Sequence, residues 1–450
     1  MRVNTLKCSV EQFKAWAQKR GWMLTPVPWV PEAFFVDRED RSSALGKDLL
    51  HLMGHAYMQE AASMLPVALL DPQPGEMILD MSAAPGSKTT FIADRMKNQG
   101  IVMANDVQEK RLWTLKSSLH RSGVYNVIVT KKVGQWFGKH MTERFDRVLC
   151  DAPCTAQGTS RKDSDALQYC SADNIGKMAR LQRELLEAAV HACKVGGRIV
   201  YSTCTLTPEE NEEVVRSILN KFSTQLEVVD PRGLGLGDGL GKAVEDSLLV
   251  QQKFPNPNPN PNPTPNPFVR LWPQTLDTEG FFCAVLRKTA PTRQREKFDP
   301  VHFQEEPLPL SRQREIGSIC QDLYGTSFLH GGDRLFLRAD QILLATDSIE
   351  NCRLPVQDYA LGLPFARKLD GGRIRISHEL VTLRGLEATK NVLELSEADL
   401  DQLFDGKDIR CPEGMRGDPI LKFGDIVIGT SLAQEGVLRN RLPRWVVAKS

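Results

Sequence analysis

The chain has 450 residues, 41% of them hydrophobic and 25% charged, proportions that exclude a fibrous or wholly disordered protein. Its 57 Lys and Arg residues nearly balance 56 Asp and Glu, so the net charge of +1 excludes a polybasic nucleic-acid binder but allows a local basic groove. At roughly 150 residues per domain, the length predicts about three domains.

No segment of the sequence is suited to cross a membrane or to direct export. The longest apolar stretch, near residues 61–70, is broken by Ser63 and Pro66 and falls far short of the ~20 residues that a membrane helix needs. The ten cysteines are scattered without a CxxC pair, and the N-terminus has no apolar signal core. We therefore expect a cytoplasmic protein with free thiols, no structural metal site and no membrane partner.

The first segment, residues 1–60, opens with a predicted helix. Ser9 and Gln12 fit a capping box, and apolar residues then recur at helical spacing until Gly21 ends the helix. The stretch TPVPWVPEAFF that follows is too rich in proline for a helix interior.

Short apolar strands alternate with longer helical stretches from Met77 to about Lys288. The predicted strands are MILD, IVMAN, NVIVT, DRVLC and RIVYS, and GFFCAVLRK adds a last one. The stretches between the first five have apolar positions three or four residues apart. This order is typical of an open parallel sheet with helices on both faces, an α/β fold.

A proline–asparagine insertion interrupts this domain at residues 255–267. Alternating proline forbids a helix and removes the donors that a sheet requires. The insertion is therefore expected to be an exposed excursion of polyproline-II type.

The C-terminal region has a weaker pattern, after a linker rich in charge and proline near residues 289–310. RLFLRADQILLAT predicts two strands joined by a turn, and Ser396 caps a short predicted helix. The end of the chain alternates apolar and polar residues, as a small half-buried barrel does. Its residues 431–450 have Glu435 as their single acid against three arginines, which form either a solvated basic edge or an RNA contact: Arg439, Arg441 and Arg444.

A loop of small residues follows the first predicted strand of the sheet and opens a helix. Ligands of such sheets bind beyond the carboxyl ends of the strands, where backbone N–H groups are free at a helix start. Asp106 ends the next strand, at an offset that suits binding to ribose hydroxyls. The loop is neither GxGxxG nor GxxxxGK[ST], which argues against NAD and ATP. The loop and Asp106 together therefore indicate another nucleoside-bearing cofactor. The alternative is that the loop is only a tight structural turn. The loop comprises Ser82, Ala83, Ala84, Pro85, Gly86, Ser87 and Lys88.

Two cysteines are expected at the same edge of the sheet. Asp151 and Cys154 come just after the fourth strand, and Cys204 comes just after the fifth. An isolated cysteine is more often a buried, inert thiol, which is our interpretation of Cys150 and Cys193. Here a carboxylate and two thiols, those of Asp151, Cys154 and Cys204, are expected to converge beside a proposed cofactor, which favours a reactive site instead.

The segments LDMSAAPGSKTT, DAPC, YSTCTLTPEEN and RVNTLK together resemble the Sun-type family of RNA cytosine-5 methyltransferases. The resemblance covers essentially the whole chain, and DAPC followed by STCT is specific. It implies S-adenosyl-L-methionine as cofactor and a Rossmann-like methyltransferase sheet over residues 61–289. It also implies a small N-terminal α/β RNA-binding domain at 1–60, a linker and pre-PUA region at 290–375 and a PUA-like β domain that binds RNA at 376–450.

The resemblance assigns a role to each residue of the site. Cys204 is the nucleophile that adds to C6 of cytosine, and Cys154 assists product release. Asp151 contacts the N3 and N4 edge of the base, and Lys88 contributes a nearby positive charge.

The same resemblance implies the cofactor contacts, which are residues Ser82 to Lys88, Asp106 on the ribose and Asp151 near the methyl end. Val133 stands where the family has an aspartate near the adenine, so we expect weaker binding or a backbone contact there. Ser82 replaces a more usual Cys or Ala, a change expected to be harmless.

The target base must be single-stranded or flipped before a thiol can reach it. Basic and aromatic residues near the N-terminus could bind RNA, although a core position is favoured for the tryptophans: Arg2, Lys7, Lys14, Lys19 and Arg20, with Trp16 and Trp22. The first hypothesis is a monomeric enzyme that acts on 16S rRNA or the small ribosomal subunit. Methylation of tRNA is the second, and a non-catalytic RNA-binding assembly factor is the third.

Overall fold

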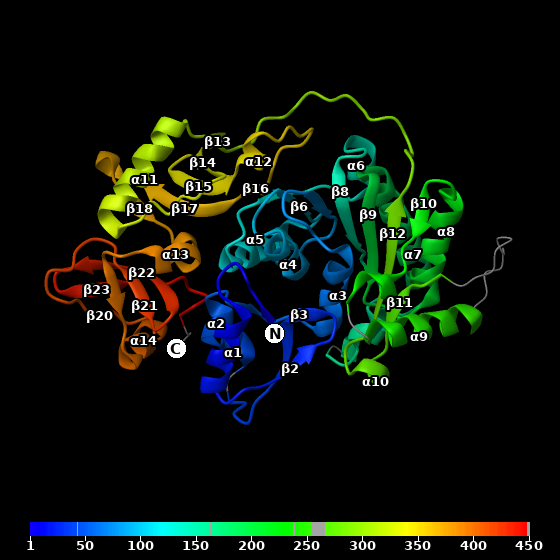
Figure 1. Cartoon of the computed structure of the whole chain (residues 1–450), viewed down its shortest axis with the longest axis horizontal. Coiled ribbons are helices and arrows are strands. Elements are labelled where there is room, and N and C mark those ends of the chain that lie inside the picture. Colours follow the sequence, from blue (N-terminus) through cyan, green and yellow to red (C-terminus); the bar gives the residue numbers. More distant parts are fainter. Residues whose placement is uncertain (43, 163, 237–238, 254–265, 448–450) are drawn as a thin grey trace.

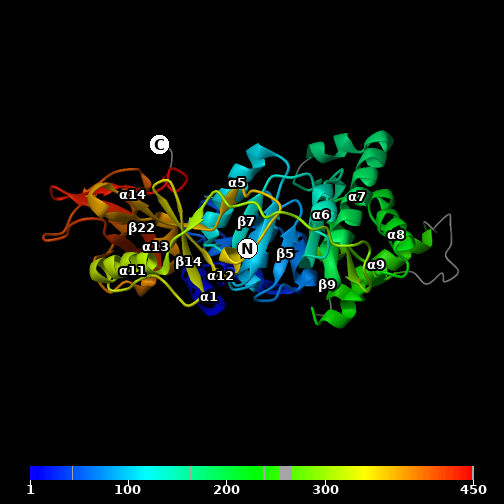
Figure 2. The same ribbon diagram turned by 90° about the horizontal axis from the view of Figure 1, so that it is seen from above.

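A computed structural model describes residues 1–447 apart from residues 43, 163, 237–238 and 254–265 (Figure 1). Residues 255–265 of the predicted proline–asparagine insertion thus lie outside the described residues. No helix among the described residues has both the length and the apolar character needed to cross a membrane. Viewed from above, the molecule is elongated, with the C-terminal sheets at one end and helices α7, α8 and α9 at the other (Figure 2).

The N-terminal unit is a four-stranded sheet in the order β2–β3–β1–β4. The predicted capping box is confirmed, because the Ser9 side chain accepts the Gln12 N–H and the Gln12 side chain accepts the Ser9 N–H. The proline-rich stretch forms the hairpin of β2 and β3, with β2 at the sheet edge, where a missing donor is tolerated. The elements are β1 (Arg2–Val3), α1 (Val10–Lys19), β2 (Met23–Val27), β3 (Val30–Asp37), α2 (Leu49–Leu52) and β4 (Ala56–Tyr57).

The central sheet has the order β10–β12–β9–β8–β5–β6–β7–β16, with β11 paired to β12. The five strands predicted first are parallel to one another, as expected. The flanking strands are antiparallel, so the sheet is mixed rather than wholly parallel. The strands are β5 (Met77–Asp80), β6 (Ile101–Asn105), β7 (Val127–Thr130), β8 (Phe145–Asp151), β9 (Cys193–Thr203), β10 (Leu226–Val228), β11 (Val269–Leu271), β12 (Phe281–Lys288) and β16 (Ala360–Leu361).

Helices cover both faces of this sheet, because side chains alternate along each strand. Ile78 points into one apolar core and Leu79 into the other. The first core includes α3 (Ala61–Leu70), α4 (Ser87–Arg95), α5 (Glu109–Ser122) and α9 (Gly239–Lys253). The second includes α6 (Gln135–His140), α7 (Ala172–Ala192) and α8 (Glu212–Lys221). The short helix α10 (Pro273–Leu276) precedes β12.

The region that the sequence analysis treated as linker, 290–375, contains regular structure. It supplies most of a five-stranded sheet, β13–β14–β15–β17–β18, and its strand β16 pairs with β7 of the central sheet. The predicted strand–turn–strand is β14 and β15. The elements are β13 (Glu306–Pro307), α11 (Leu310–Tyr324), β14 (Asp333–Arg338), β15 (Gln341–Thr346), α12 (Asp347–Glu350), β17 (Leu363–Lys368) and β18 (Ile374–Ile376).

A second five-stranded sheet, β19–β21–β22–β23–β20, closes the chain. Ser396 caps α14 through its side chain, as predicted, and Asp399 completes a capping box. The elements are α13 (His378–Arg384), β19 (Val392–Glu394), α14 (Glu397–Phe404), β20 (Ile409–Arg410), β21 (Ile420–Phe423), β22 (Ile426–Gln434) and β23 (Val437–Asn440).

Candidate active site

The candidate site lies at the carboxyl ends of the parallel strands, where Asn105 ties three strand ends together. Its Nδ2 donates to the backbone oxygens of Met81, at 3.1 Å, and Lys132, at 2.9 Å, just after β5 and β7. Its Oδ1 accepts from Thr130 Oγ1 at 3.0 Å. Because Asn105 is buried, these bonds replace water and hold the loops at fixed spacing.

The small-residue loop packs its backbone closely against β6 and α5. The Ala83 N–H donates to the Asn105 carbonyl at 2.7 Å. Gly86 has φ of +109°, and a Cβ there would lie 3.0 Å from Ser118 Cβ. Glycine is therefore required at the start of α4, for its conformation as well as its size.

Asp106 directly follows β6, and its carboxylate is directed at this loop. One carboxylate oxygen accepts the Ala84 N–H at 3.3 Å and pairs with Arg111 Nη1 at 3.2 Å, and the other accepts the Gln108 N–H at 3.0 Å. Arg111 also donates to the Ala84 carbonyl, so that it clamps the loop from outside. The sequence analysis did not identify Arg111, since an arginine on an exposed helix turn has no local signature.

Asp80, the last residue of β5, is a second buried carboxylate beside the loop. Its Oδ2 accepts from Thr89 Oγ1 at 2.8 Å, while its Oδ1 has no hydrogen-bond partner among the described residues. Burial, with a further contribution from the Asp151 charge, raises the pKa of Asp80 to about 7. Asp80 was not among the predicted site residues, although its place in the LDMSAAPGSK motif was a usable signal.

Asp151, at the end of β8, and Lys88, in the first turn of α4, form an ion pair. Lys88 Nζ lies 2.7 Å from Asp151 Oδ2, and Ser202 Oγ donates to the other oxygen at 2.7 Å. Burial lowers the pKa of Lys88, but the Asp151 charge and hydrogen bond outweigh it, and the net pKa lies above its usual value. Lys88 is therefore a fixed cation at the site.

The two cysteines predicted to converge do so. The register of β8 and β9 sets Asp151 beside Ser202, and the chain then brings Cys154 Sγ within 3.3 Å of Cys204 Sγ. The Gly158 N–H donates to the Cys204 carbonyl at 2.9 Å, which holds the second loop against the first. Both thiols are half-buried rather than sealed in the core.

The contact between the thiols makes their acidities different. The hydrogen bond from Cys154 lowers the pKa of Cys204, and the Lys88 charge adds to this effect, against burial and the Asp151 charge. The same hydrogen bond, together with burial, raises the pKa of Cys154 well above its usual value. Cys204 is therefore the thiol that ionises first.

The structure brings the predicted site residues together as one constellation. Asp151 pairs with Lys88 of the loop of residues 82–88, the two thiols lie 3.3 Å apart, and Asp106 accepts the Ala84 N–H of the same loop. Within the part of the chain that the structure describes, no group of three or more His, Cys, Asp and Glu side chains could hold a metal ion.

Val133, in the position where an adenine contact was expected, follows β7 and is 56% exposed. Its side chain contributes apolar surface there and no hydrogen-bonding group. Whether this residue weakens cofactor binding stays a prediction.

Two N-terminal basic residues, the buried Arg2 and the half-buried Lys7, direct their charged groups to partners within the protein, contrary to expectation. Arg2 is 1% exposed and pairs with Asp94 at 3.1 Å. Lys7 donates its ammonium protons to the carbonyls of Met53 and Arg121, and burial lowers its pKa to about 7. Both residues anchor the N-terminal unit to the central domain, so the expectation that they contact RNA was wrong.

The remaining flanking residues divide between surface and core. Lys14 and Lys19 are exposed, whereas Trp16 is buried, the position that the sequence analysis favoured. In the C-terminal tail, Arg439 pairs with Asp408 at 2.7 Å and Arg441 with Asp418 at 2.8 Å. Arg444 and its neighbour Trp445 are exposed.

Comparison with known proteins gives consistent matches over this chain. Residues 67–287 match the family model described as 16S rRNA methyltransferase RsmB/F, and residues 1–61 match the N-terminal domain of 16S rRNA methyltransferase RsmF. The chain is 34% identical to the ribosomal RNA small subunit methyltransferase F of Psychromonas ingrahamii, over 99% of this chain and 90% of that protein. The protein of the same name from Aeromonas hydrophila is 37% identical, with the same coverage. Among solved structures, a methyltransferase homolog from Pyrococcus horikoshii is 36% identical, with a TM-score of 0.51, over 64% of this chain and 85% of that one.

Proposed function

Because the chain belongs to the 16S rRNA methyltransferase RsmB/F family, we propose that it methylates C5 of a cytosine in 16S ribosomal RNA, using S-adenosyl-L-methionine. The observation that carries this proposal is the pair of thiols, Cys154 and Cys204, 3.3 Å apart beside the small-residue loop. Cytosine C5 is a poor nucleophile, and a thiolate that adds to the neighbouring C6 activates it.

The residues around the loop suit the cofactor. Asp106 offers a buried carboxylate to ribose hydroxyls, and the unpartnered Asp80 oxygen can accept a hydrogen bond from a ligand. We assign the cofactor to residues 82–88, Asp106 and Asp151, with Val133 near its adenine. When bound, S-adenosyl-L-methionine supplies an electrophilic methyl group next to the target base.

Cys204 is the nucleophile in this proposal. Its thiolate forms a bond to C6 of cytosine; the C5=C6 electron pair moves to form C4=C5 and the C4=N3 pair moves onto N3, so that C5 becomes an enamine carbon. Asp151 accepts a hydrogen bond from the exocyclic amine at the N3 and N4 edge, while Lys88 offsets negative charge. After C5 is methylated, loss of the C5 proton lets the S–C6 bond break, and Cys154 assists this release.

The units that flank the central sheet are assigned to RNA binding, at residues 1–60 and 376–450. Exposed Lys14, Lys19, Arg444 and Trp445 offer charge for phosphates and an aromatic face for a base. We infer that the enzyme works as a monomer in the cytoplasm, where bacterial ribosomal RNA is found.

The test is a methyl-transfer assay with labelled S-adenosyl-L-methionine and three separate substrates: 16S RNA, small ribosomal subunits and total tRNA. We expect label on a cytosine of the 16S RNA, either free or in the subunit. Label confined to tRNA would overturn the substrate assignment. No label on any RNA, with cofactor binding intact, would favour a non-catalytic assembly factor.

A further inference from the structure

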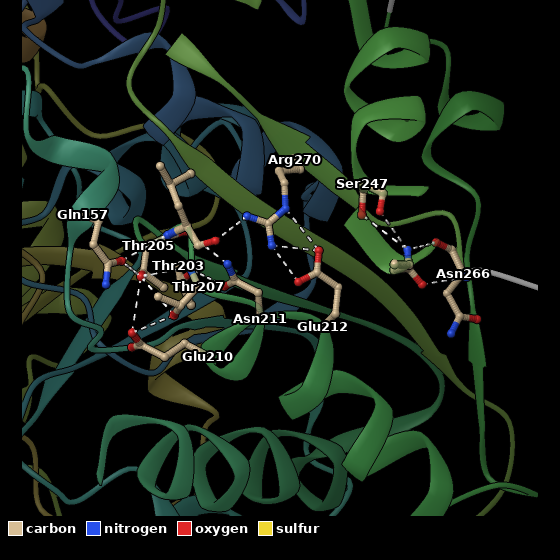
Figure 3. A network of polar contacts seen from close by, with 12 residues as sticks. Gln157, Thr203, Thr205, Thr207, Glu210, Asn211, Glu212, Ser247, Asn266 and Arg270 are labelled. Carbon is tan, nitrogen blue, oxygen red and sulfur yellow. Dashed lines mark hydrogen bonds and ion pairs between the residues drawn. The ribbon is translucent and has the colours of Figure 1, made fainter. Parts of the chain in front are cut away.

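Glu210 accepts hydrogen bonds from Thr205 and Thr207 at one end of the polar network that Figure 3 draws. Its side chain is fully buried, and it accepts hydrogen bonds from the Thr155 N–H at 3.1 Å, Gln182 Nε2 at 2.7 Å and Thr207 Oγ1 at 3.1 Å. The hydroxyls of Thr155 and Thr205 both donate to its Oε1. A carboxylate this deep in a protein is costly unless donors surround it, as they do here.

The two threonines connect Glu210 to the reactive thiols. Thr155 directly follows Cys154, and Thr205 directly follows Cys204, so a single carboxylate oxygen binds both cysteine loops. These loops leave different strands, β8 and β9, and no covalent linkage fixes their spacing.

Further hydrogen bonds brace the same junction. Gln182 Nε2 also donates to the Pro153 carbonyl at 2.9 Å, which joins the first cysteine loop to α7. The Gln157 side chain donates to Thr155 Oγ1 at 2.7 Å, and its Oε1 shares the single proton of the Thr205 hydroxyl with Glu210 Oε1. The Tyr201 hydroxyl donates to the backbone oxygen of Glu210 at 2.5 Å, so the carboxylate itself is anchored.

We propose that Glu210 is a positioning residue for the methyl-transfer reaction, and that it holds the two cysteine loops so that the Cys154 thiol can hydrogen-bond Cys204. Glu210 does not touch the reacting atoms; it acts through Thr155 and Thr205. Its catalytic consequence rests on the proposed function, whereas the spacing of the thiols does not. The hydrogen bond between the two sulfur atoms, 3.3 Å apart, weakens as the loops separate and is lost once they move apart by about an ångström.

The test compares Glu210→Gln with Glu209→Gln, its exposed neighbour, as the control. Glutamine has the size of glutamate, but its NH2 group is a hydrogen-bond donor. It would face N–H and O–H groups that donate to the carboxylate in the wild type. We expect Glu210→Gln to lower the single-turnover rate about 10- to 100-fold, with unchanged cofactor affinity. The rising limb of its pH–rate profile should move about one unit to higher pH, since Cys204 loses its donor.

A second measurement reports the thiol spacing without any methyl transfer. Oxidised glutathione is added, and formation of the Cys154–Cys204 disulfide by thiol–disulfide exchange is followed by peptide mass spectrometry. We expect the disulfide to form several-fold more slowly in Glu210→Gln than in the wild type or in Glu209→Gln.

An unshifted pH profile and an unchanged disulfide rate in folded Glu210→Gln would overturn the proposal, even if the melting temperature falls. Should that variant not fold, Thr155→Val, which keeps the shape and removes one hydroxyl, decides by the same two readouts. A wild-type protein without methyl transfer to any RNA would refute the proposed function. A rate of disulfide formation that depends on Glu210 would still support its role in holding the two cysteine loops.

Discussion

The sulfur atoms of Cys154 and Cys204 lie 3.3 Å apart, although 50 positions separate the two residues in the chain. The contact exists because β8 and β9 are parallel neighbours, so that both residues leave the sheet at the same edge. The hydrogen bond lowers the pKa of Cys204 and raises that of Cys154. One thiol is thereby prepared to attack, and the other keeps its proton.

Replacement of Cys204 by alanine should abolish methyl transfer, by at least about a thousandfold, because it removes the thiol assigned to form the bond to C6. Cofactor affinity, measured by calorimetry, should stay close to that of the wild type, since the loop of residues 82–88 is untouched. Cys352→Ala, at a half-buried thiol outside the site, is the matched control. Turnover retained by Cys204→Ala would show that the nucleophile is another residue.

Replacement of Cys154 by alanine should trap the enzyme on its substrate. If this thiol assists breakage of the S–C6 bond, the variant accumulates an RNA-linked species that survives denaturing gel electrophoresis. The double variant Cys154→Ala with Cys204→Ala should give no such band, because the bond never forms. Absence of the band from the single variant would remove Cys154 from product release.

Replacement of Lys88 by methionine should move the pH dependence of the reaction upward. After the larger effect of the Cys154 hydrogen bond, the Lys88 charge also lowers the pKa of Cys204. The thiolate fraction, and with it the single-turnover rate, rises with pH through this pKa. Without the ammonium group the rising limb should shift by about one unit to higher pH. Lys177→Met, at an exposed lysine of α7, should leave the limb in place; an unshifted limb in Lys88→Met would contradict this role.

Removal of one partner from the buried ion pair of Arg270 and Glu212 should destabilise the folded protein strongly. The two side chains are 0% and 1% exposed and lie 2.6 Å apart, and Arg270 Nη1 also donates to the Leu206 carbonyl at 2.8 Å (Figure 3). Glu212→Gln leaves a buried guanidinium without its counter-charge, which should lower the free energy of unfolding by about 3 to 5 kcal/mol.

Urea denaturation checks this value, with Glu213→Gln, the exposed neighbour on α8, as control. A change in Glu212→Gln no larger than that of the control would mean that water or another acid compensates the arginine.

Local sequence patterns alone were enough to predict the parallel strands, the helix caps at Ser9 and Ser396 and the strand ends that Cys154 and Cys204 follow. Each of these depends on residues close together in the chain: alternation or apolar runs for strands, an acceptor three residues before a free N–H for caps, and the rule that parallel strands end at one edge. The cofactor loop and Asp106 could be identified for the same reason.

Only the tertiary structure decided which charged residues are buried and what they bind. Arg2 has the same sequence signature as a surface arginine, yet it pairs with Asp94, 92 positions away. Glu210 stands beside the exposed Glu209 in the chain, and only the packing of α7 and two loops from separate strands surrounds it with donors. Burial of charge depends on partners distant in sequence, and a pattern of neighbouring residues does not encode them.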